Sequence, residues 1–307
     1  MTESLELRAR VAGAPISWGV SEVPGWGWQA PPRRVLGEMR ALGLRATELG
    51  PPGFLPANPE ALGALLKEFG LRLVGGFLAV ELHSPAAAER APASISAAAR
   101  TIEEAGGELL VLAAGGAGAG YARREVLDRE AWRRMAGLLA AARHVARERG
   151  LALAVHPHMG TLIEGPGEVA ALLELTDADL CLDSGHLAVA GVDPAELAER
   201  AAGRVRLVHL KDVDLDLAAR VREGTLPYPE AVAQGLYRPL GEGGVDLGGL
   251  VRRLEAGGYG GWYVLEQDVM LSAEPEPGSG PAADVERSLG WFARLADGYQ
   301  GGLRTRR

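Results

Sequence analysis

Leu151-Ala-Leu-Ala-Val-His156-Pro-His158 is a short apolar run that ends on two histidines. The pattern recurs in Leu180-Cys-Leu-Asp183-Ser-Gly-His186 and in Val205-Arg-Leu-Val-His209-Leu-Lys211-Asp212, and Trp262-Tyr-Val-Leu-Glu266-Gln-Asp268 ends on carboxylates. A buried strand has no use for imidazole or carboxylate groups at its end unless those groups bind something or react. Gathered from separate strands, they are the usual ligands of a divalent metal, so the pattern predicts a metal-dependent enzyme.

Apolar runs of this kind alternate with segments of helical period along the whole chain. The eight runs are Val11–Trp18, Ala46–Leu49, Arg72–Leu82, Glu108–Ala114, Leu151–His156, Leu180–Asp183, Val205–Leu210 and Trp262–Glu266. Continuous apolar runs are typical of a parallel sheet that is buried on both faces. Eight strand–helix units therefore predict an α/β protein with a single (β/α)8 TIM barrel, in which the carboxyl ends of the strands converge on one pocket.

An open doubly wound sheet is the alternative architecture. It requires a glycine-rich phosphate turn after its first strand, and the segment Gly19–Trp28 lacks that spacing. The glycine-rich segment Gly115–Gly120 also fails the fingerprint, and we interpret it as a flexible active-site loop. The barrel is therefore favoured.

The predicted helices fill the intervals between the runs. They are Arg33–Leu42, Pro59–Phe69, Ala86–Ala105, Asp128–Arg149, Gly167–Leu175, Asp193–Ala202, Leu247–Ala256 and Ala283–Ala296. The long segment Leu215–Pro239, with a helical piece at Tyr228–Gln234, is expected to form a lid or an interface element. We expect one domain over residues 1–307, with an ordered barrel from about residue 8 to 298 and a loose tail at 301–307.

Composition narrows the class of protein. Hydrophobic residues make up 47% of the 307 residues, the net charge is −8, and Cys181 is the single cysteine. This balance argues against nucleic-acid binding, and one cysteine suits a reducing compartment. The sequence shows neither a signal-peptide pattern nor an apolar stretch of 18 residues, so we expect a cytoplasmic protein without a membrane partner.

The strand ends supply the candidate site residues. His156 and His158 are two positions apart, so both can point inward from one strand. Together with Asp183, His209 and Glu266 they offer imidazole and carboxylate ligands for Mn²⁺ or Co²⁺, with Mg²⁺, Fe²⁺ and Zn²⁺ as alternatives. Any single histidine could instead be structural, but such residues end four successive strands.

These motifs, with Gly13-Ala-Pro-Ile-Ser-Trp18 and Ala46-Thr-Glu48-Leu-Gly50, resemble the xylose-isomerase-like superfamily of metal-dependent barrels. That group includes sugar isomerases, ketose 3-epimerases, endonuclease IV and inosose dehydratases. The combination of His156-Pro-His-Met-Gly-Thr161, Asp183-Ser-Gly-His186 and His209-Leu-Lys-Asp-Val213 is most similar to the inosose dehydratases.

The resemblance implies a role for each matching residue. Asp183, His209 and Glu266 match metal ligands of the family, and His156 stands where many relatives have a glutamate ligand. Either His156 or His158 could be the ligand from that strand, while the other acts as an acid or base. The resemblance further implies substrate contacts, which we assign to Glu48, Trp18, His186 and Lys211.

The implied chemistry begins with removal of a proton next to a ketone, by Glu266 or by a histidine. Loss of a β-hydroxyl, helped by His186 or His158, would make the enzyme a lyase that dehydrates inosose (2-keto-myo-inositol). Reprotonation would instead make it a sugar isomerase or ketose 3-epimerase. The expected partner is a small polyhydroxylated ketone, and we expect a homo-oligomer, either a dimer or a tetramer.

Two further classes are disfavoured. A trinuclear zinc nuclease like endonuclease IV needs extra histidine and glutamate ligands from earlier strands. The third run offers only His83, the fourth offers none, and the net charge of −8 is wrong for DNA. A non-catalytic sugar-binding barrel would be expected to have lost a ligand. Phosphorylated substrates are disfavoured because Gly241-Glu-Gly-Gly244 reads as a rim loop and not as a phosphate cradle.

Overall fold

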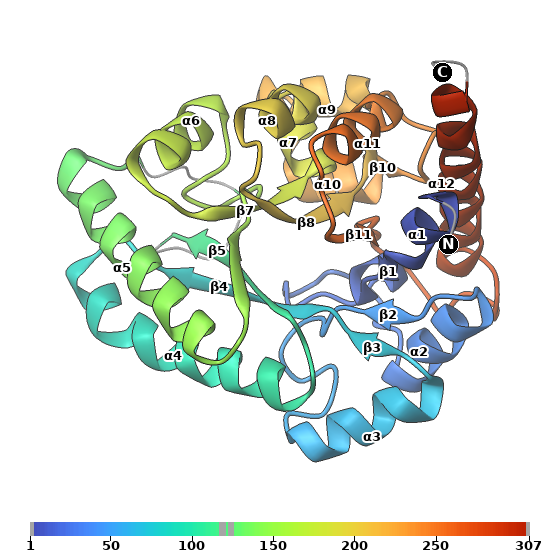
Figure 1. Ribbon diagram of the computed structural model, residues 1–307, viewed down its shortest axis with the longest axis horizontal. Helices are drawn as coiled ribbons and strands as arrows, with labels where there is room; N and C mark the ends of the chain where they lie inside the picture. The colour runs from blue at the N-terminus through green and yellow to red at the C-terminus, as the bar shows by residue number, and fades with distance from the viewer. Residues whose placement is uncertain (1–2, 117–120, 122–125, 305–307) are drawn as a thin grey trace.

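The computed structural model describes residues 3–116, 121 and 126–304, and within them nine strands form one parallel sheet that curves round on itself (Figure 1). In chain order these strands are β1 (Val11–Gly13), β2 (Ala46–Thr47), β3 (Arg72–Leu73), β4 (Gly75–Glu81), β5 (Leu109–Gly115), β6 (Ala152–Val155), β7 (Asp179–Asp183), β8 (Val205–Leu210) and β11 (Trp262–Leu265).

Val74 closes the sheet into a barrel. The strand order runs from β3 through β2, β1, β11, β8, β7, β6 and β5 to β4, and only Val74 separates β3 from β4. Its N–H donates to the carbonyl of Thr47 at 2.9 Å, and its carbonyl accepts from the N–H of Glu108 at 2.9 Å. Strands β3 and β4 are therefore two halves of one bent strand. The predicted (β/α)8 barrel is confirmed, and the open sheet is wrong.

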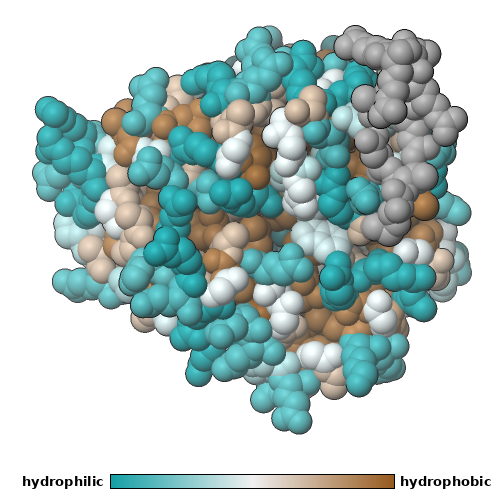
Figure 2. Space-filling model, viewed as in Figure 1, coloured by the Kyte–Doolittle hydropathy of each residue, from teal (hydrophilic) through white to brown (hydrophobic). Residues whose placement is uncertain are grey.

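One main helix follows each strand of the barrel. These helices are α2 (Pro32–Ala41), α3 (Pro59–Phe69), α4 (Pro85–Glu104), α5 (Arg129–Glu148), α6 (Pro166–Leu175), α8 (Pro194–Arg200), α11 (Leu247–Ala256) and α12 (Pro281–Arg304). The side chain of Asp193 caps α8 by accepting the N–H groups of Ala195 and Glu196. On the face seen in Figure 2, hydrophilic residues cover the helices and hydrophobic residues lie between them.

Several shorter elements decorate this frame. They are α1 (Glu3–Ala9), the 3-10 helix η1 (Pro15–Trp18), α7 (Ser184–Ala190), α9 (Leu215–Arg222), α10 (Tyr228–Ala233) and the antiparallel pair β9 (Asp212–Val213) and β10 (Tyr237–Arg238). Helix α1 packs beside α12, so the two ends of the described chain lie close together (Figure 1). Among the added helices, only α10 was predicted, as Tyr228–Gln234.

Two predicted flexible segments fall partly outside the described residues. Of the glycine-rich loop, Gly115 ends β5 and Gly116 follows it, while residues 117–120 lie outside the description. Helix α12 extends to Arg304, past Gly301 where a loose tail was predicted, and residues 305–307 lie outside. Among the described helices, none has both the length and the apolar character that crossing a membrane requires.

The barrel interior explains how the site is positioned. Small and branched apolar side chains from the strands form a separate buried cluster inside the sheet, namely Ala12, Ala14, Ala46, Val74, Leu109, Val111, Ala154, Cys181, Leu207 and Val264. Side chains on a strand alternate between its two faces, so the residue two positions further on points the same way. The next inward layer is polar, and it consists of Glu48 after Ala46, His156 after Ala154, Asp183 after Cys181, His209 after Leu207 and Glu266 after Val264.

Candidate active site

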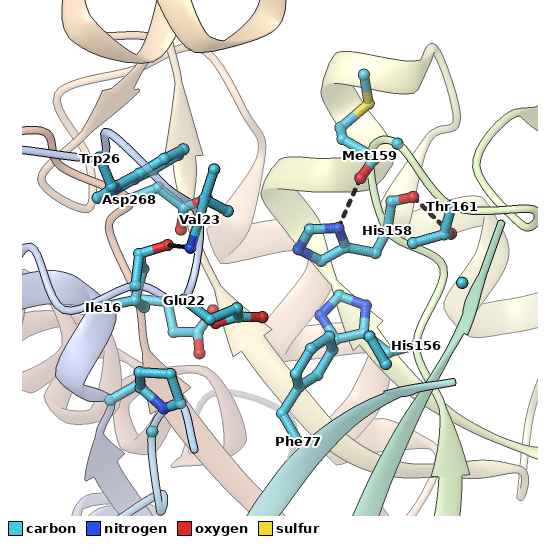
Figure 3. A pocket seen from close by; sticks show the side chains of 18 of the residues that line it. Ile16, Glu22, Val23, Trp26, Phe77, His156, His158, Met159, Thr161 and Asp268 are labelled. Carbon is cyan, nitrogen blue, oxygen red and sulfur yellow. Dashed lines mark hydrogen bonds between the residues drawn. The ribbon is translucent and has the colours of Figure 1, made fainter. Parts of the chain in front are cut away.

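A pocket of about 470 Å³ opens at the carboxyl ends of the strands. Its polar end is lined by Glu48, His156, His158, His209, Lys211, Glu266 and Asp268. Its walls are largely apolar, and Figure 3 shows Ile16, Val23 and Trp26 facing Phe77 and His158 across the cavity. Because polar groups lie at one end of the pocket and apolar side chains line its walls, the pocket can accept a small molecule and hold it by a few polar groups.

Asp183 lies at the centre of the polar layer. Its Oδ1 accepts the N–H groups of Gly185 and His186 at 2.8 and 2.9 Å, which caps α7 and fixes the carboxylate. Its Oδ2 accepts no hydrogen bond, although Nε2 of His156 lies 3.6 Å away and Nδ1 of His209 lies 3.5 Å away. Nζ of Lys211 lies 3.2 Å from the same oxygen, so two imidazoles and an ammonium surround it.

His209 joins the two sides of this layer. Its Nδ1 lies 3.3 Å from Oε2 of Glu266, and its Nε2 lies 3.2 Å from Oε2 of Glu48. Neither ring nitrogen makes a hydrogen bond with good geometry. His209 therefore has both nitrogens directed at carboxylates from different strands.

The side-chain amine of Lys211 fills the gap between the carboxylates. Its Nζ lies 2.8 Å from Oδ1 of Asp268, 2.9 Å from Oε2 of Glu266 and 3.2 Å from Oδ2 of Asp183. Lys211 is 2% exposed. Burial lowers the pKa of this amine, but the three carboxylates outweigh burial and hold its pKa well above the ordinary value. Lys211 is therefore a charged ammonium.

A family model of the xylose isomerase-like TIM barrel matches residues 36–295. The chain belongs to this family. It is 31% identical over 270 residues to an inosose dehydratase of Geobacillus kaustophilus (strain HTA426), covering 84% of this chain and 87% of the relative. It is 33% identical over 270 residues to the rhizopine catabolism protein MocC of Rhizobium meliloti, covering 85% and 82%. The family resemblance inferred from the motifs is confirmed.

Solved structures of other xylose isomerase-like barrels share the fold. An L-ribulose 3-epimerase superimposes with a TM-score of 0.70 at 18% identity, covering 97% of this chain and 98% of that one. The probable 3-DHS dehydratase AsbF of Bacillus anthracis superimposes with a TM-score of 0.66 at 14% identity, covering 92% and 97%. These structures share the fold, and the family and the sequence relatives indicate an enzyme of the lyase or isomerase/epimerase type.

The donor set of this xylose isomerase-like barrel fits a divalent metal. Among the described residues, three overlapping groups have ligand atoms within 4.8 Å of one another, namely His156 with Cys181 and His209, His156 with Asp183 and His186, and Glu48 with His209 and Glu266. No single group contains all four predicted ligands. Both buried ring nitrogens of His209 lack hydrogen bonds, as expected for atoms that can face a bound cation.

The two strand-end histidines differ in their surroundings. Nδ1 of His156 lies 2.8 Å from the carbonyl of Pro157. Nδ1 of His158 lies 2.7 Å from the carbonyl of Met159, as Figure 3 shows. A carbonyl only accepts, so both rings carry their proton on Nδ1 and a lone pair on Nε2. Burial lowers the pKa of each, with help from nearby positive groups, so both are neutral.

Glu266, which directly follows β11, has a pKa that is raised toward neutral pH. Burial raises the pKa of Glu266 to about 7, against the opposing effect of His209 and Lys211. The floor of the pocket thus contains a carboxyl group that can both accept and return a proton near neutral pH.

The structure brings most of the predicted residues together. Glu48, His156, His158, His209, Lys211 and Glu266 line the pocket. Asp183 and His186 lie directly behind that lining and are 0% and 1% exposed. His186 therefore does not touch the open pocket, unlike the substrate contact that the sequence predicted.

Trp18 is not in the pocket. It ends the 3-10 helix η1, whose turn carries the indole outward into the main core, where Nε1 donates to Oε2 of Glu38 at 2.7 Å. Trp26, further along the same loop, lines the pocket and donates its indole N–H to the carbonyl of Val269 at 2.9 Å. Trp18 is therefore not the substrate contact that was predicted, and the tryptophan that lines the pocket is Trp26.

Other site residues escaped the sequence reasoning. Asp268 faces inward by the same two-residue alternation as Glu266, so strand periodicity could have identified it. Tyr228 and Tyr237 come from the segment predicted as a lid or interface element, and their positions depend on its packing. Phe77 lies on β4, whose apolar sequence gives no sign of a pocket role.

Proposed function

We propose that this protein is a metal-dependent dehydratase of inosose (2-keto-myo-inositol) or of a closely similar keto-polyol. The observation that carries the proposal is the position of Glu266 on the pocket floor, where its Oε2 lies 2.9 Å from Nζ of Lys211 and 3.3 Å from Nδ1 of His209. The relatives named inosose dehydratase support the choice of reaction. They are similar over most of both chains.

We assign the metal to His156, Asp183, His209 and Glu266. When bound, a divalent ion would polarise the substrate ketone and acidify the neighbouring C–H bond. The mixture of imidazole and carboxylate ligands suits Mn²⁺ or Co²⁺, and Mg²⁺, Fe²⁺ and Zn²⁺ are the alternatives. Of the two strand-end histidines, we assign His156 as ligand because its Nε2 faces Asp183, and because His158 belongs to none of the described metal-binding groups.

The protein's own groups divide the proton transfers. Glu266 is the proposed base for the proton next to the ketone, because its carboxylate faces the pocket beside the ammonium of Lys211. The ammonium of Lys211 would donate hydrogen bonds to a substrate oxygen and stabilise negative charge there. His158 presents an Nε2 lone pair to the pocket. It would first accept a proton from the substrate and would then return that proton to the leaving hydroxyl, which departs as water.

The apolar walls of the pocket can contact the ring of a polyol. A six-membered polyol has C–H groups on its ring faces, and Trp26 and Phe77 offer aromatic surfaces on opposite sides of the pocket (Figure 3). Glu48 is placed on the polar side to accept hydrogen bonds from hydroxyl groups. The proposed partner is therefore a small polyhydroxylated ketone; a homo-oligomeric state remains a prediction.

A sugar isomerase or ketose 3-epimerase is the second candidate. It would share the first proton transfer with the dehydratase and differ only in the later steps of the reaction. The observation in its favour is the pair Glu48 and Glu266, which approach His209 from its two sides. His156 in place of a strand-end glutamate favours elimination.

The deciding experiment is proton NMR of metal-loaded enzyme with 2-keto-myo-inositol in D₂O, with the metal chelated before each spectrum. Loss of water to give an unsaturated or dione product is the expected result. Exchange of the proton next to the ketone, or a new stereoisomer without loss of water, would establish the isomerase or epimerase instead. Failure of both reactions, in a preparation that binds metal, would overturn this substrate class.

A further inference from the structure

Five buried polar side chains form a closed ring behind the pocket floor. Nζ of Lys211 lies 3.0 Å from Nε2 of His186, and Nδ1 of His186 lies 3.1 Å from the hydroxyl of Tyr237. The Tyr237 hydroxyl lies 3.0 Å from that of Tyr228, which donates to Oδ2 of Asp268 at 3.2 Å. Oδ1 of Asp268 lies 2.8 Å from Nζ of Lys211 and completes the ring.

The ring joins parts of the chain that are far apart in sequence. His186 lies in α7, Tyr228 in α10 and Tyr237 in β10, while Lys211 follows β8 and Asp268 follows β11. Lys211 and Asp268 line the pocket, and the two tyrosines and His186 do not. All five are less than a tenth exposed. The three residues outside the pocket therefore connect Lys211 to Asp268, the two members of the ring that line it.

The chemistry of the ring allows one direction of hydrogen bonding. An ammonium has only donors, so Nε2 of His186 must accept from Lys211, and the neutral imidazole must carry its proton on Nδ1. That proton is donated to the oxygen of Tyr237. The Tyr237 hydroxyl is then free to donate to Tyr228.

The carboxylate of Asp268, at the opposite end of the ring, imposes the same direction. A carboxylate has only acceptors, so the Tyr228 hydroxyl must donate to Asp268. Its oxygen then accepts from Tyr237, which in turn must accept from His186. The ammonium and the carboxylate thus impose one arrangement of protons on the three groups between them.

We propose that Tyr228 and Tyr237 are positioning residues that hold His186 as the Nδ1–H tautomer, so that its Nε2 orients the ammonium of Lys211 toward the pocket. His186 then acts through Lys211 and does not give a proton to the substrate. The consequence for turnover rests on the proposed function, whereas the tautomer of His186 does not.

The tautomer can be measured directly. Enzyme labelled with ¹⁵N-histidine is stripped of metal, loaded with diamagnetic Zn²⁺ and examined by long-range ¹H–¹⁵N correlation NMR. Among the six histidines, the signals of His186 are identified by their loss in His186→Gln. We expect a protonated Nδ1 and an unprotonated Nε2. An Nε2–H tautomer, or a ring that exchanges between both, would overturn the proposal.

Tyr237→Phe tests the role of the hydroxyl. Without an acceptor for its Nδ1–H, His186 should become a mixture of tautomers, and kcat should fall by roughly 10- to 100-fold with little change in KM, as is usual when an outer partner of a catalytic group is removed. Tyr228→Phe should have the same kind of effect, because the Tyr237 hydroxyl can then turn and donate to His186. If Tyr237→Phe does not fold, Tyr228→Phe tests the same proposal.

Tyr263→Phe is the matched control, since Tyr263 is also buried but donates its hydroxyl to Glu255, away from the ring. It should leave the tautomer and kcat unchanged. Wild-type tautomer and kcat in both ring variants would refute the positioning role. If no keto-polyol is turned over but the tautomer behaves as expected, the proposed function fails and the positioning of Lys211 stands.

Discussion

The Nζ of Lys211 lies 2.9 Å from Oε2 of Glu266, and the two side chains form a buried ion pair at the floor of the pocket. The pair brings a positive charge next to a carboxyl whose pKa is about 7. Because the pair is enclosed by further carboxylates and histidines, small changes in the shape or charge of its neighbours should have measurable effects on turnover.

Lys211→Arg should reduce kcat/KM by at least about tenfold, or roughly 1.4 kcal/mol of transition-state stabilisation. The site surrounds a compact ammonium with acceptors on several sides, and a planar guanidinium cannot meet them in the same way. Steady-state kinetics measures the loss. Lys67→Arg is the control, because Lys67 is the other lysine of the chain and is exposed on α3. Unchanged kinetics in Lys211→Arg would assign Lys211 a structural role only.

Asp183→Asn and His209→Gln should each lose bound metal and activity while the barrel remains folded. Asparagine retains an oxygen that can cap α7, whereas Asp183→Ala would also lose the cap and about 0.5–2 kcal/mol of stability. Metal content by atomic spectrometry and thermal unfolding by circular dichroism separate the two effects. His144→Gln, on the exposed surface of α5, is the control. A ligand variant with full metal content and full activity would disprove the assigned set.

Gly185→Ala should lower both stability and kcat. A Cβ at this position would lie 2.5 Å from Cβ of Lys211 and 2.8 Å from Cε1 of Tyr237, so these two side chains would have to move. Gly137→Ala is the contrasting substitution, since a Cβ there meets nothing within 4 Å on the exposed side of α5. It should raise stability by about 0.5–1 kcal/mol without affecting kinetics. Equal behaviour of the two variants in thermal unfolding and turnover would contradict the close packing of Lys211.

Asp212 should stabilise the loop before α11. Its carboxylate accepts the N–H groups of Val213, Gly241, Gly243 and Val245, at 2.8 to 3.1 Å. The backbone amides of the loop Gly241–Gly244 therefore bind the carboxylate of Asp212, in agreement with the interpretation of this segment as a rim loop. Asp212→Ala should cost about 1–3 kcal/mol for the unmet donors.

Formate or acetate should restore part of the stability lost in Asp212→Ala, because either anion can occupy the space that the carboxylate leaves. Thermal unfolding with increasing formate, at constant ionic strength with chloride as reference, measures the effect. The wild-type enzyme should show no comparable rise. Equal responses of both proteins would mean that the amides are satisfied in another way.

The sequence predicted the barrel well because its strands carry a strong and simple signal. In the apolar runs Ala152–Val155 and Val205–Leu210, residues 153–155 and 207–210 are buried, so both faces of each strand are covered there, and the strand ends carry polar groups where parallel strands converge. The position of Glu266 could be predicted for the same reason. Alternation along a strand is a local property, so it needs no knowledge of the rest of the fold.

The positions of Trp18, which was predicted wrongly, and Tyr237, which was not predicted, depend on the packing of elements beyond the strands. Trp18 points away from the pocket because η1 breaks the alternation of β1. Helix α7 begins directly at the end of β7, where the side chain of Asp183 caps it, and its short sequence contains Ser184 and Gly185, which favour helix poorly. Tyr237 reaches the site only because β10 pairs with β9.

The inward layers of the barrel have a consequence for how such proteins diversify. Ala154 and Cys181 fill the interior of the barrel, and the residues that do chemistry occupy the next level of the same strands. A lineage can therefore exchange groups at the upper level, such as His156 for another ligand, while the lower level continues to hold the barrel together. New reactions can then arise on this scaffold without the chain first having to find a new way to fold.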